Sequence, residues 1–262
     1  MKSFFLMIGF FTRLPVPKVE FTEQSYQKAV KLMPLVGLVI GAILVLIVFI
    51  ANLLAVPALI RGAIVLCAYI FLTGGLHFDG LADTCDGVFS GRNREQSLEI
   101  MKDSRIGVFG TLGIFMAGLF YFALFSEAHI TAVLVFPVVG RACCLISASL
   151  VPYARTDGMG KATGNAGGPV SVASAVVSVV GASILTFPMY LIFAEPEEQS
   201  VVLLAIVPIV CSLIAALAAI IVTVIVTRTF KKRLGGVTGD TFGAVIELSS
   251  LVYLLVFILF FA

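Results

Sequence analysis

Residues 33–54 read MPLVGLVIGAILVLIVFIANLL and contain no charged side chain. A run of about 20 mostly apolar residues is long enough to cross a bilayer as an α-helix. Six further runs of this kind follow, at residues 57–73, 107–126, 130–151, 170–194, 201–227 and 241–261. The sequence therefore predicts an all-α protein, a polytopic transmembrane helical bundle of about seven spans. A shorter apolar run at residues 4–12 leaves room for a re-entrant segment.

The composition agrees with burial in a membrane. Of the 262 residues 60% are hydrophobic and 12% are charged, whereas soluble domains carry about 25% charged residues. The mean hydropathy is +1.12. We expect one integral membrane domain over residues 1–262 with the lipid bilayer around it, and no cleaved signal peptide, because the N-terminus lacks a small-residue cleavage site. Nucleic-acid binding is not expected, because no basic face is available for it.

The basic residues are distributed very unevenly along the chain. Fifteen of the 17 Lys and Arg residues lie in four polar segments, at residues 1–32, 74–106, 152–169 and 228–240. With seven spans, all four segments fall on one side of the membrane. The loops expected on the other side are SEAH and AEPEEQS, at residues 126–129 and 194–200, and they carry acids without Lys or Arg. The positive-inside rule then predicts that the N-terminus and the polar loops are cytoplasmic.

One of these loops carries a regular set of carboxylates. In GGLHFDGLADTCDG, residues 74–87, the acids Asp79, Asp83 and Asp86 stand at positions i, i+4 and i+7. On a helix they lie within about 60° of one face, where like charges repel unless a cation neutralises them. Oxygen ligands suit Mg²⁺, Mn²⁺ or Ca²⁺, and the glycines and apolar residues between the acids argue against a merely solvated acidic face. A further metal ligand is one role open to His77, but an oxygen-dominated site favours a hydrogen bond or a contact with the substrate.

Cations follow the acids closely in the sequence. IMKDSRIGVFG, residues 100–110, places Lys102, Asp103 and Arg105 just before the third span. Arg offers a fork of donors that matches phosphate oxygens, and Lys adds a point charge. The alternative role of these cations is to anchor the cytoplasmic end of the third span. Their closeness to the carboxylates favours a ligand that the metal and the cations share.

Two further loops have the composition of an anion site. GGVTGDT, residues 235–241, opens the last span and offers Thr238 and Asp240 at a helix N-terminus, where backbone amides bind anions readily. Residues 152–165 combine glycines with Arg155 and form another flexible, positively charged patch.

Two ionisable residues stand inside predicted spans. Arg141 lies in the fourth span, and Glu247 lies about two turns into the last one. Charged groups at that depth are costly and are functional candidates. A structural ion pair between Arg141 and Glu247 is the alternative, and the sequence leaves both open.

Acids for a metal, cations for phosphates and glycines for close approach indicate phosphoryl or nucleotidyl transfer. A CDP-alcohol phosphotransferase is one rival, but its D-G-x-x-A-R pattern is not met, because Gly80-Leu81-Ala82 is followed by Asp83. A cation-coupled transporter is another rival. Transporters place their site near the midplane and often have inverted repeats, whereas most acids here stand at span ends and no repeat is visible.

Five segments together resemble the cobalamin synthase family, the adenosylcobinamide-GDP ribazoletransferases. They are FFTRLPVP (10–17), GGLHFDGLADTCDG (74–87), IMKDSRIGVFG (100–110), VPYAR (151–155) and LGGVTGDTFGAVIEL (234–248). The resemblance extends from end to end of the chain. It implies a reaction that joins adenosylcobinamide-GDP to α-ribazole, or to α-ribazole 5′-phosphate, with release of GMP. It also implies a need for Mg²⁺ and a place in the bacterial inner membrane.

The resemblance gives the candidate residues expected roles. Asp79, Asp83 and Asp86 would hold the metal, and Asp83 or Asp86 would accept the proton of the ribazole hydroxyl. Charge stabilisation is assigned to Lys102 and Arg105. The residues expected to bind substrate are His77, Asp103, Arg141, Arg155, Thr238, Asp240 and Glu247. Whether one chain builds the site or a homo-oligomer shares it stays open.

Overall fold

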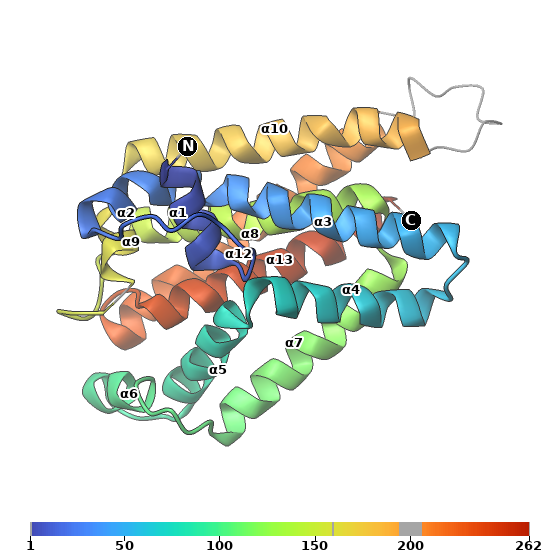
Figure 1. Ribbon diagram of the computed structural model, residues 1–262. Coiled ribbons are helices and arrows are strands. Elements are labelled where there is room, and N and C mark those ends of the chain that lie inside the picture. The colour runs from blue at the N-terminus through green and yellow to red at the C-terminus, as the bar shows by residue number, and fades with distance from the viewer. Residues whose placement is uncertain (1, 159, 194–205, 262) are drawn as a thin grey trace.

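A computed structural model describes residues 2–158, 160–193 and 206–261 of the chain (Figure 1). Helices dominate these residues, and the one pairing of extended backbone within them is a parallel bridge between Tyr153 and Val237. The helices are α1 (Lys2–Phe11), α2 (Glu23–Ala29), η1 (Val30–Leu32), α3 (Met33–Leu53), α4 (Ala58–Thr73), α5 (Leu76–Phe89), α6 (Arg94–Ile100), α7 (Val108–Glu127), α8 (Ile130–Leu150), α9 (Lys161–Asn165), α10 (Pro169–Phe193), α12 (Val207–Leu234) and α13 (Gly239–Phe261).

The predicted all-α, polytopic bundle is confirmed. Within the described ranges, six helices are long and apolar enough to cross a membrane, and α4 with α5 makes a seventh candidate that is bent by 89°. The α4 helix alone matches the predicted span at 57–73, and α5 lies in what we predicted as the loop 74–106. We therefore treat α4 as the span and α5 as part of the polar end of the bundle.

Helix boundaries differ from the prediction mainly on the polar side. The α12 helix continues to Leu234 instead of ending at residue 227, so its basic residues belong to a helix and not to a loop. Hydropathy marks only the apolar part of a helix, whereas Lys and Arg in a last turn favour its C-terminal dipole. Gly235, at φ 80°, then ends the helix. The predicted span ends at residues 194 and 201 lie outside the described residues.

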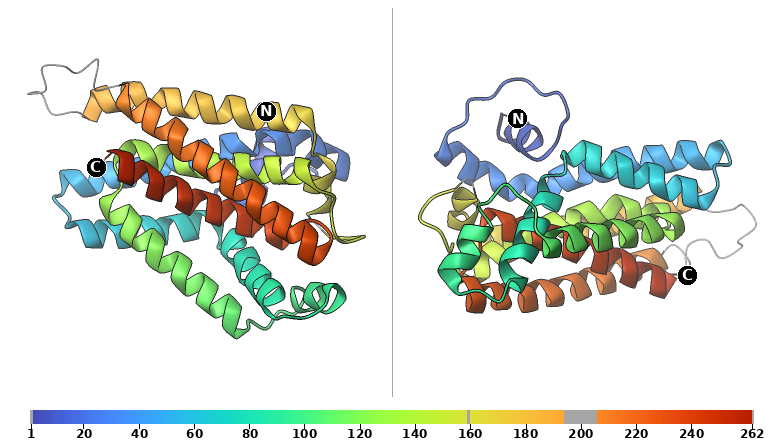
Figure 2. Two further views of the ribbon diagram at one scale, coloured as in Figure 1. Left: turned by 180° about the vertical axis from the view of Figure 1, so that it is seen from behind. Right: turned by 90° about the horizontal axis from the view of Figure 1, so that it is seen from below.

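The α8 helix is the centre of the bundle. Its apolar window is 94% buried, because α3, α10, α12 and α13 pack around it. Seen from behind, α12 and α13 cover it (Figure 2). The outer faces of α7, α10 and α12 instead expose large apolar side chains such as Phe115, Val177 and Leu217. A bilayer favours this arrangement, in which one helix is enclosed and the surrounding helices turn apolar side chains outward.

Glycines let α3 approach α8 closely. A Cβ atom on Gly37 would collide with the Pro137 carbonyl oxygen, and one on Gly41 would collide with the Leu134 carbonyl oxygen. Small residues at such contacts are the usual means by which helix backbones approach each other in membranes, where the hydrophobic effect does not drive their association. The α3–α8 contact therefore depends on these two positions.

Replacing Gly41 by Leu should destabilise the protein, because the added side chain meets the α8 backbone and not a movable side chain. Overpacking of this kind costs about 1–3 kcal/mol or more. A Cβ atom on Gly118 in α7 would meet no other atom within 4 Å, so Gly118→Leu is the matched control. Thermal unfolding of the purified proteins in detergent should show a lower midpoint for Gly41→Leu alone. Equal midpoints would contradict the close α3–α8 contact.

Candidate active site

Two glycines turn the chain at the polar end of the bundle. The α4 helix ends at Thr73, and Gly74 and Gly75 follow at φ 64° and 70°, in the left-handed region that glycine adopts without strain. The Arg13 amide donates to the Leu72 carbonyl at 2.8 Å and fixes the N-terminal segment against this turn. As a result α5 leaves the direction of α4 at 89°.

The α5 helix packs directly on the start of α13. A Cβ atom on Gly80 would lie 2.7 Å from the Asp240 carbonyl oxygen, and one on Gly243 would lie 2.9 Å from the His77 carbonyl oxygen. Neither position leaves room for a side chain. This approach brings the α5 carboxylates next to Asp240, which is about 160 residues away in the sequence.

Backbone hydrogen bonds join the two other polar loops. The Ala154 amide donates to the Val237 carbonyl at 2.7 Å, and the Val237 amide donates to the Pro152 carbonyl at 3.0 Å. Arg94 of α6 reinforces this junction, because its guanidinium donates to the Leu234 carbonyl at 2.9 Å and to the Ala154 carbonyl at 3.1 Å. The segments VPYAR and GGVTGD therefore lie side by side.

Negative charge accumulates where these elements meet. The pKa of Asp83 is raised to about 7, first by burial and then by the charges of Asp240, Asp79 and Asp86 in that order, against an opposing effect of Arg155. Arg155 lies 3.0 Å from Asp240 and is largely buried. The carboxylate that most affects Asp83 is thus Asp240 of α13 and not its neighbours on α5.

Asp86 has a different environment from the other carboxylates. Its two oxygens accept hydrogen bonds from the Gly107 amide at 2.7 Å and the Gly110 amide at 2.9 Å. These amides stand at the first turn of α7, where backbone donors lack partners within the helix. Asp86 therefore ties α5 to the start of α7, and its negative charge is favourable at the positive end of that helix.

Two cavities meet at Asp79. A cavity of about 260 Å³ is lined by His77, Asp79, Arg155 and Asp240, together with glycines of the α8–α9 loop. A second cavity of about 620 Å³ also includes Asp79 in its lining, together with Arg13 and the Gly74–Gly75 turn. The exposed Asp79 side chain thus belongs to the lining of both cavities.

The cations of the MKDSR segment lie at the surface. Arg105 pairs with Asp103 at 2.7 Å, and this hydrogen bond lowers the pKa of Asp103 to about 2. Lys102 lies 4.0 Å from Asp157. These side chains do not line either cavity at Asp79. The structure therefore does not bring Lys102, Asp103 and Arg105 together with the carboxylates that precede them.

Thr238 acts locally at the start of α13. Its hydroxyl accepts from the Thr241 amide at 3.2 Å and donates to Asp240 at 3.3 Å. Thr238 is fully buried, so it caps the helix and orients Asp240 beside Arg155.

Glu247 is fully buried one layer below the cavity. The Tyr121 hydroxyl donates to its Oε2 at 2.6 Å, and the Tyr69 hydroxyl donates to its Oε1 at 3.1 Å. His77 Nδ1 lies 3.7 Å from the same Oε1. Glu247 therefore gathers α4, α5 and α7 onto α13.

Arg141 is also fully buried, but it does not form the predicted alternative ion pair. In the described part of the chain no salt bridge joins Arg141 to Glu247, and the Arg141 Nη1 instead donates to the Pro137 carbonyl at 3.1 Å. Its Nε and Nη2 atoms have no hydrogen-bond partner. The hydroxyls of Tyr69 and Tyr121 instead donate to Glu247.

The carboxylate oxygens of Asp79, Asp83 and Asp240 are chemically suited to a divalent cation, although they do not converge on one point. Among the described residues, no three His, Cys, Asp or Glu side chains converge closely enough to hold a metal ion. Burial and, after it, repulsion from Asp240 and Asp79 nevertheless raise the pKa of Asp83. A hard cation with oxygen ligands would relieve that repulsion, whereas Asp86 is already engaged by the α7 amides.

Sequence reasoning missed the partners that hold these residues. Tyr69, Tyr121 and Arg94 received no role, yet they fix Glu247 and the loop junction. Tyrosine inside an apolar span needs a hydrogen-bond partner for its hydroxyl. The presence of two tyrosines and Glu247 in different spans was therefore the one signal in the sequence that could have indicated these hydrogen bonds.

Six or seven candidate spans within the described residues, and a cavity at one end that is lined by Asp79, Asp240 and Arg155, define a polytopic membrane protein with a charged cavity. The family described as cobalamin-5-phosphate synthase matches residues 3–258. The chain belongs to this family.

Curated relatives align over nearly their whole length. Three relatives bear the name adenosylcobinamide-GDP ribazoletransferase. The protein of Fusobacterium nucleatum is 35% identical and the alignment covers 98% of this chain and 97% of the relative. The values are 38%, 99% and 98% for Acetivibrio thermocellus, and 37%, 97% and 96% for Alkaliphilus oremlandii. No solved structure matches the chain.

The contacts of Asp86 predict that it matters for stability more than Asp79 does. Asp86→Asn removes the charge from two amide hydrogen bonds and leaves one carboxamide oxygen to accept them, which should cost about 1.5–3 kcal/mol. Asp79→Asn changes an exposed side chain and should stay within about 0.5 kcal/mol of the parent protein. Thermal unfolding of both variants, without substrate or added metal, makes the comparison. Equal unfolding midpoints of the two variants would contradict a structural role for Asp86.

Proposed function

We propose that the chain transfers the adenosylcobinamide-phosphate moiety of adenosylcobinamide-GDP to α-ribazole, or to its 5′-phosphate, and releases GMP. The observation that carries this proposal is the cavity at Asp79, where carboxylates of α5 and α13 meet Arg155. The names of the curated relatives supply the substrates. This reaction attaches the lower ligand in cobalamin synthesis.

We propose further that the transfer depends on Mg²⁺. Asp79 and Asp83 would hold the cation, and Asp240 is the candidate for a third carboxylate, because it lines the same cavity as Asp79 and its charge acts on Asp83. When bound, Mg²⁺ would neutralise the pyrophosphate and polarise the phosphorus–oxygen bond that breaks. We first expected Asp86 among the ligands. The α7 amides hold its carboxylate, so Asp86 would contribute only the effect of its negative charge on Asp83.

The chain's own residues provide binding and orientation. The oxygen of the ribazole hydroxyl forms a bond to the phosphorus nearer the cobinamide, and the bond from that phosphorus to the bridging oxygen breaks as GMP leaves. The hydroxyl proton passes to the carboxylate cluster. Arg155, held by Asp240 at 3.0 Å, is the cation placed to contact the non-bridging oxygens. Lys102 and Arg105 stand at the surface and would meet the outer part of the nucleotide.

Replacing Asp83 by Asn should abolish most of the turnover. The change removes one charged oxygen ligand from the proposed cation site, and a metal contributes several kcal/mol to charge stabilisation, so the rate should fall at least about a hundredfold. Purified, reconstituted protein with Mg²⁺, adenosylcobinamide-GDP and α-ribazole is followed for GMP. Glu99→Gln, an exposed change on α6, is the control and should keep the parent rate.

Two results would contradict this assignment. One is parent-level turnover by a correctly inserted Asp83→Asn protein. The other is release of CMP from CDP-diacylglycerol in place of GMP from the corrinoid substrate, which would make the chain a CDP-alcohol phosphotransferase.

We propose that the protein resides in the bacterial inner membrane with the carboxylate end in the cytoplasm. Four basic segments lie at that end, and positive loops stay on the cytoplasmic side. Reporter fusions after Arg92 should therefore be fluorescent with green fluorescent protein and inactive with alkaline phosphatase. Fusions after Glu127 should behave in the opposite way. Active alkaline phosphatase after Arg92 would reverse the orientation.

A further inference from the structure

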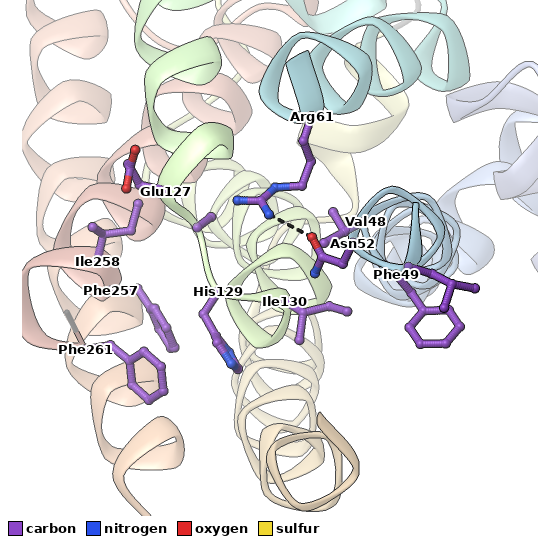
Figure 3. A pocket seen from close by; sticks show the side chains of 12 residues that line it. Val48, Phe49, Asn52, Arg61, Glu127, His129, Ile130, Phe257, Ile258 and Phe261 are labelled. Carbon is purple, nitrogen blue, oxygen red and sulfur yellow. Dashed lines mark hydrogen bonds between the residues drawn. The ribbon is translucent and has the colours of Figure 1, made fainter. Parts of the chain in front are cut away.

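A separate cavity opens at the end of the bundle opposite the carboxylates (Figure 3). It has a volume of about 570 Å³ and is formed by the end of α3, the start of α4, the α7–α8 connection and the end of α13. The carboxylate cavity uses the other ends of α3 and α13, at Met33 and at Gly239. The two cavities therefore stand at opposite membrane faces.

Arg61 gives this cavity an uncompensated positive charge. Its Nη1 donates to the Asn52 side chain at 2.7 Å, and its Nη2 donates to the Ser126 carbonyl at 2.8 Å. Both acceptors are neutral, and within the described residues Arg61 forms no salt bridge with a carboxylate. Since a guanidinium carries five N–H donors, donors remain for a further acceptor.

The position of Arg61 runs against the charge distribution of the chain. Apart from Arg61 and the buried Arg141, every Lys and Arg lies in the four segments at the other end. Arg at a membrane boundary usually extends into water, but the hydrogen bonds to Asn52 and Ser126 hold this guanidinium among α3, α4 and α7. A cation fixed in this way, on the face that otherwise excludes cations, indicates a bound anion.

The rest of the lining describes the ligand more closely. Glu127 lies on the same cavity without a salt bridge to any described residue, so the cavity offers one positive and one negative group that are not paired with each other (Figure 3). Phe257, Ile258 and Phe261 form an apolar wall beside them. The His129 ring packs against Phe261 with the ring centres 4.9 Å apart and extends that wall.

We propose that this cavity binds one zwitterionic phospholipid of the leaflet on that face. Its phosphate would accept from Arg61, its ammonium group would meet Glu127, and an acyl chain would lie along the α13 wall. A charge-assisted bond from Arg to phosphate is strong, and the cavity has the size of ordinary small-molecule sites. The proposal does not depend on the transfer reaction.

Thermal unfolding of delipidated protein in detergent tests the site, because a ligand that binds only the folded state raises the unfolding temperature. The added probes are phosphatidylethanolamine, phosphatidylglycerol, diacylglycerol and inorganic phosphate. Phosphatidylethanolamine should give the largest rise in the parent protein. Diacylglycerol lacks the phosphate and inorganic phosphate lacks the chains, so neither should reproduce that rise.

Variants assign the effect to residues. Arg61→Gln should bind phosphatidylethanolamine about tenfold more weakly, as the loss of a bond of about 1.4 kcal/mol implies. Glu127→Gln should remove the preference for phosphatidylethanolamine over phosphatidylglycerol. Lys232→Gln, an exposed change at the opposite end, is the control and should respond as the parent does.

Arg61 also links three helices, so Arg61→Gln risks a folding defect. Ile258→Trp fills the cavity, leaves Arg61 and its two hydrogen bonds intact, and should abolish the lipid response by itself. A parent-like response in both variants would overturn the proposal. So would an equal rise with diacylglycerol, or saturation by inorganic phosphate alone, which would make this a site for a free anion.

Discussion

The direct contact between the α5 and α13 backbones is the interaction on which the polar end of the molecule depends. Gly80 and Gly243 have no side chains to keep the helices apart, so the Asp240 carbonyl and the α5 backbone come into contact. Without that approach the carboxylates of α5 would face only one another and water. With it Asp79 shares a cavity with Asp240 and Arg155, and the charge of Asp240 acts on Asp83. The turn at Gly74 and Gly75 makes the contact geometrically accessible, because it directs α5 across the bundle.

The membrane bundle could be predicted from sequence because a bilayer imposes a simple rule. Every backbone polar group in the hydrocarbon must be satisfied internally, so long apolar runs become helices. The helical periodicity of Asp79, Asp83 and Asp86 was likewise sufficient to place all three on α5. Periodicity fixes the angle of a residue about its own helix, but it does not identify the neighbouring element. Asp86 therefore shares the face with Asp83 and yet serves the amides of α7.

The same limit explains the cations and the buried charges. Arg105 is close to the carboxylates in sequence, but an acid two residues away satisfies it first, whereas Arg155 reaches the cavity through the pairing of two distant loops. Glu247 and Arg141 were rightly singled out as unusual. Two tyrosine hydroxyls solvate Glu247, and hydrogen bonds to a charged group are worth about 1.5–3 kcal/mol each. The sequence shows tyrosines in other spans, but it does not show which of them contact Glu247, because that depends on how the helices pack.

The position of Asp79 between two cavities has a stereochemical consequence. Each cavity can hold one ligand next to this carboxylate, so neither ligand has to leave before the other arrives. An alcohol in one cavity that attacks the phosphorus opposite a departing nucleotide in the other would lie in line with the bond that breaks. Direct displacement in that geometry inverts the configuration at phosphorus, so a chiral phosphate would emerge inverted. A route through a phosphorylated side chain would instead need two displacements and would retain it.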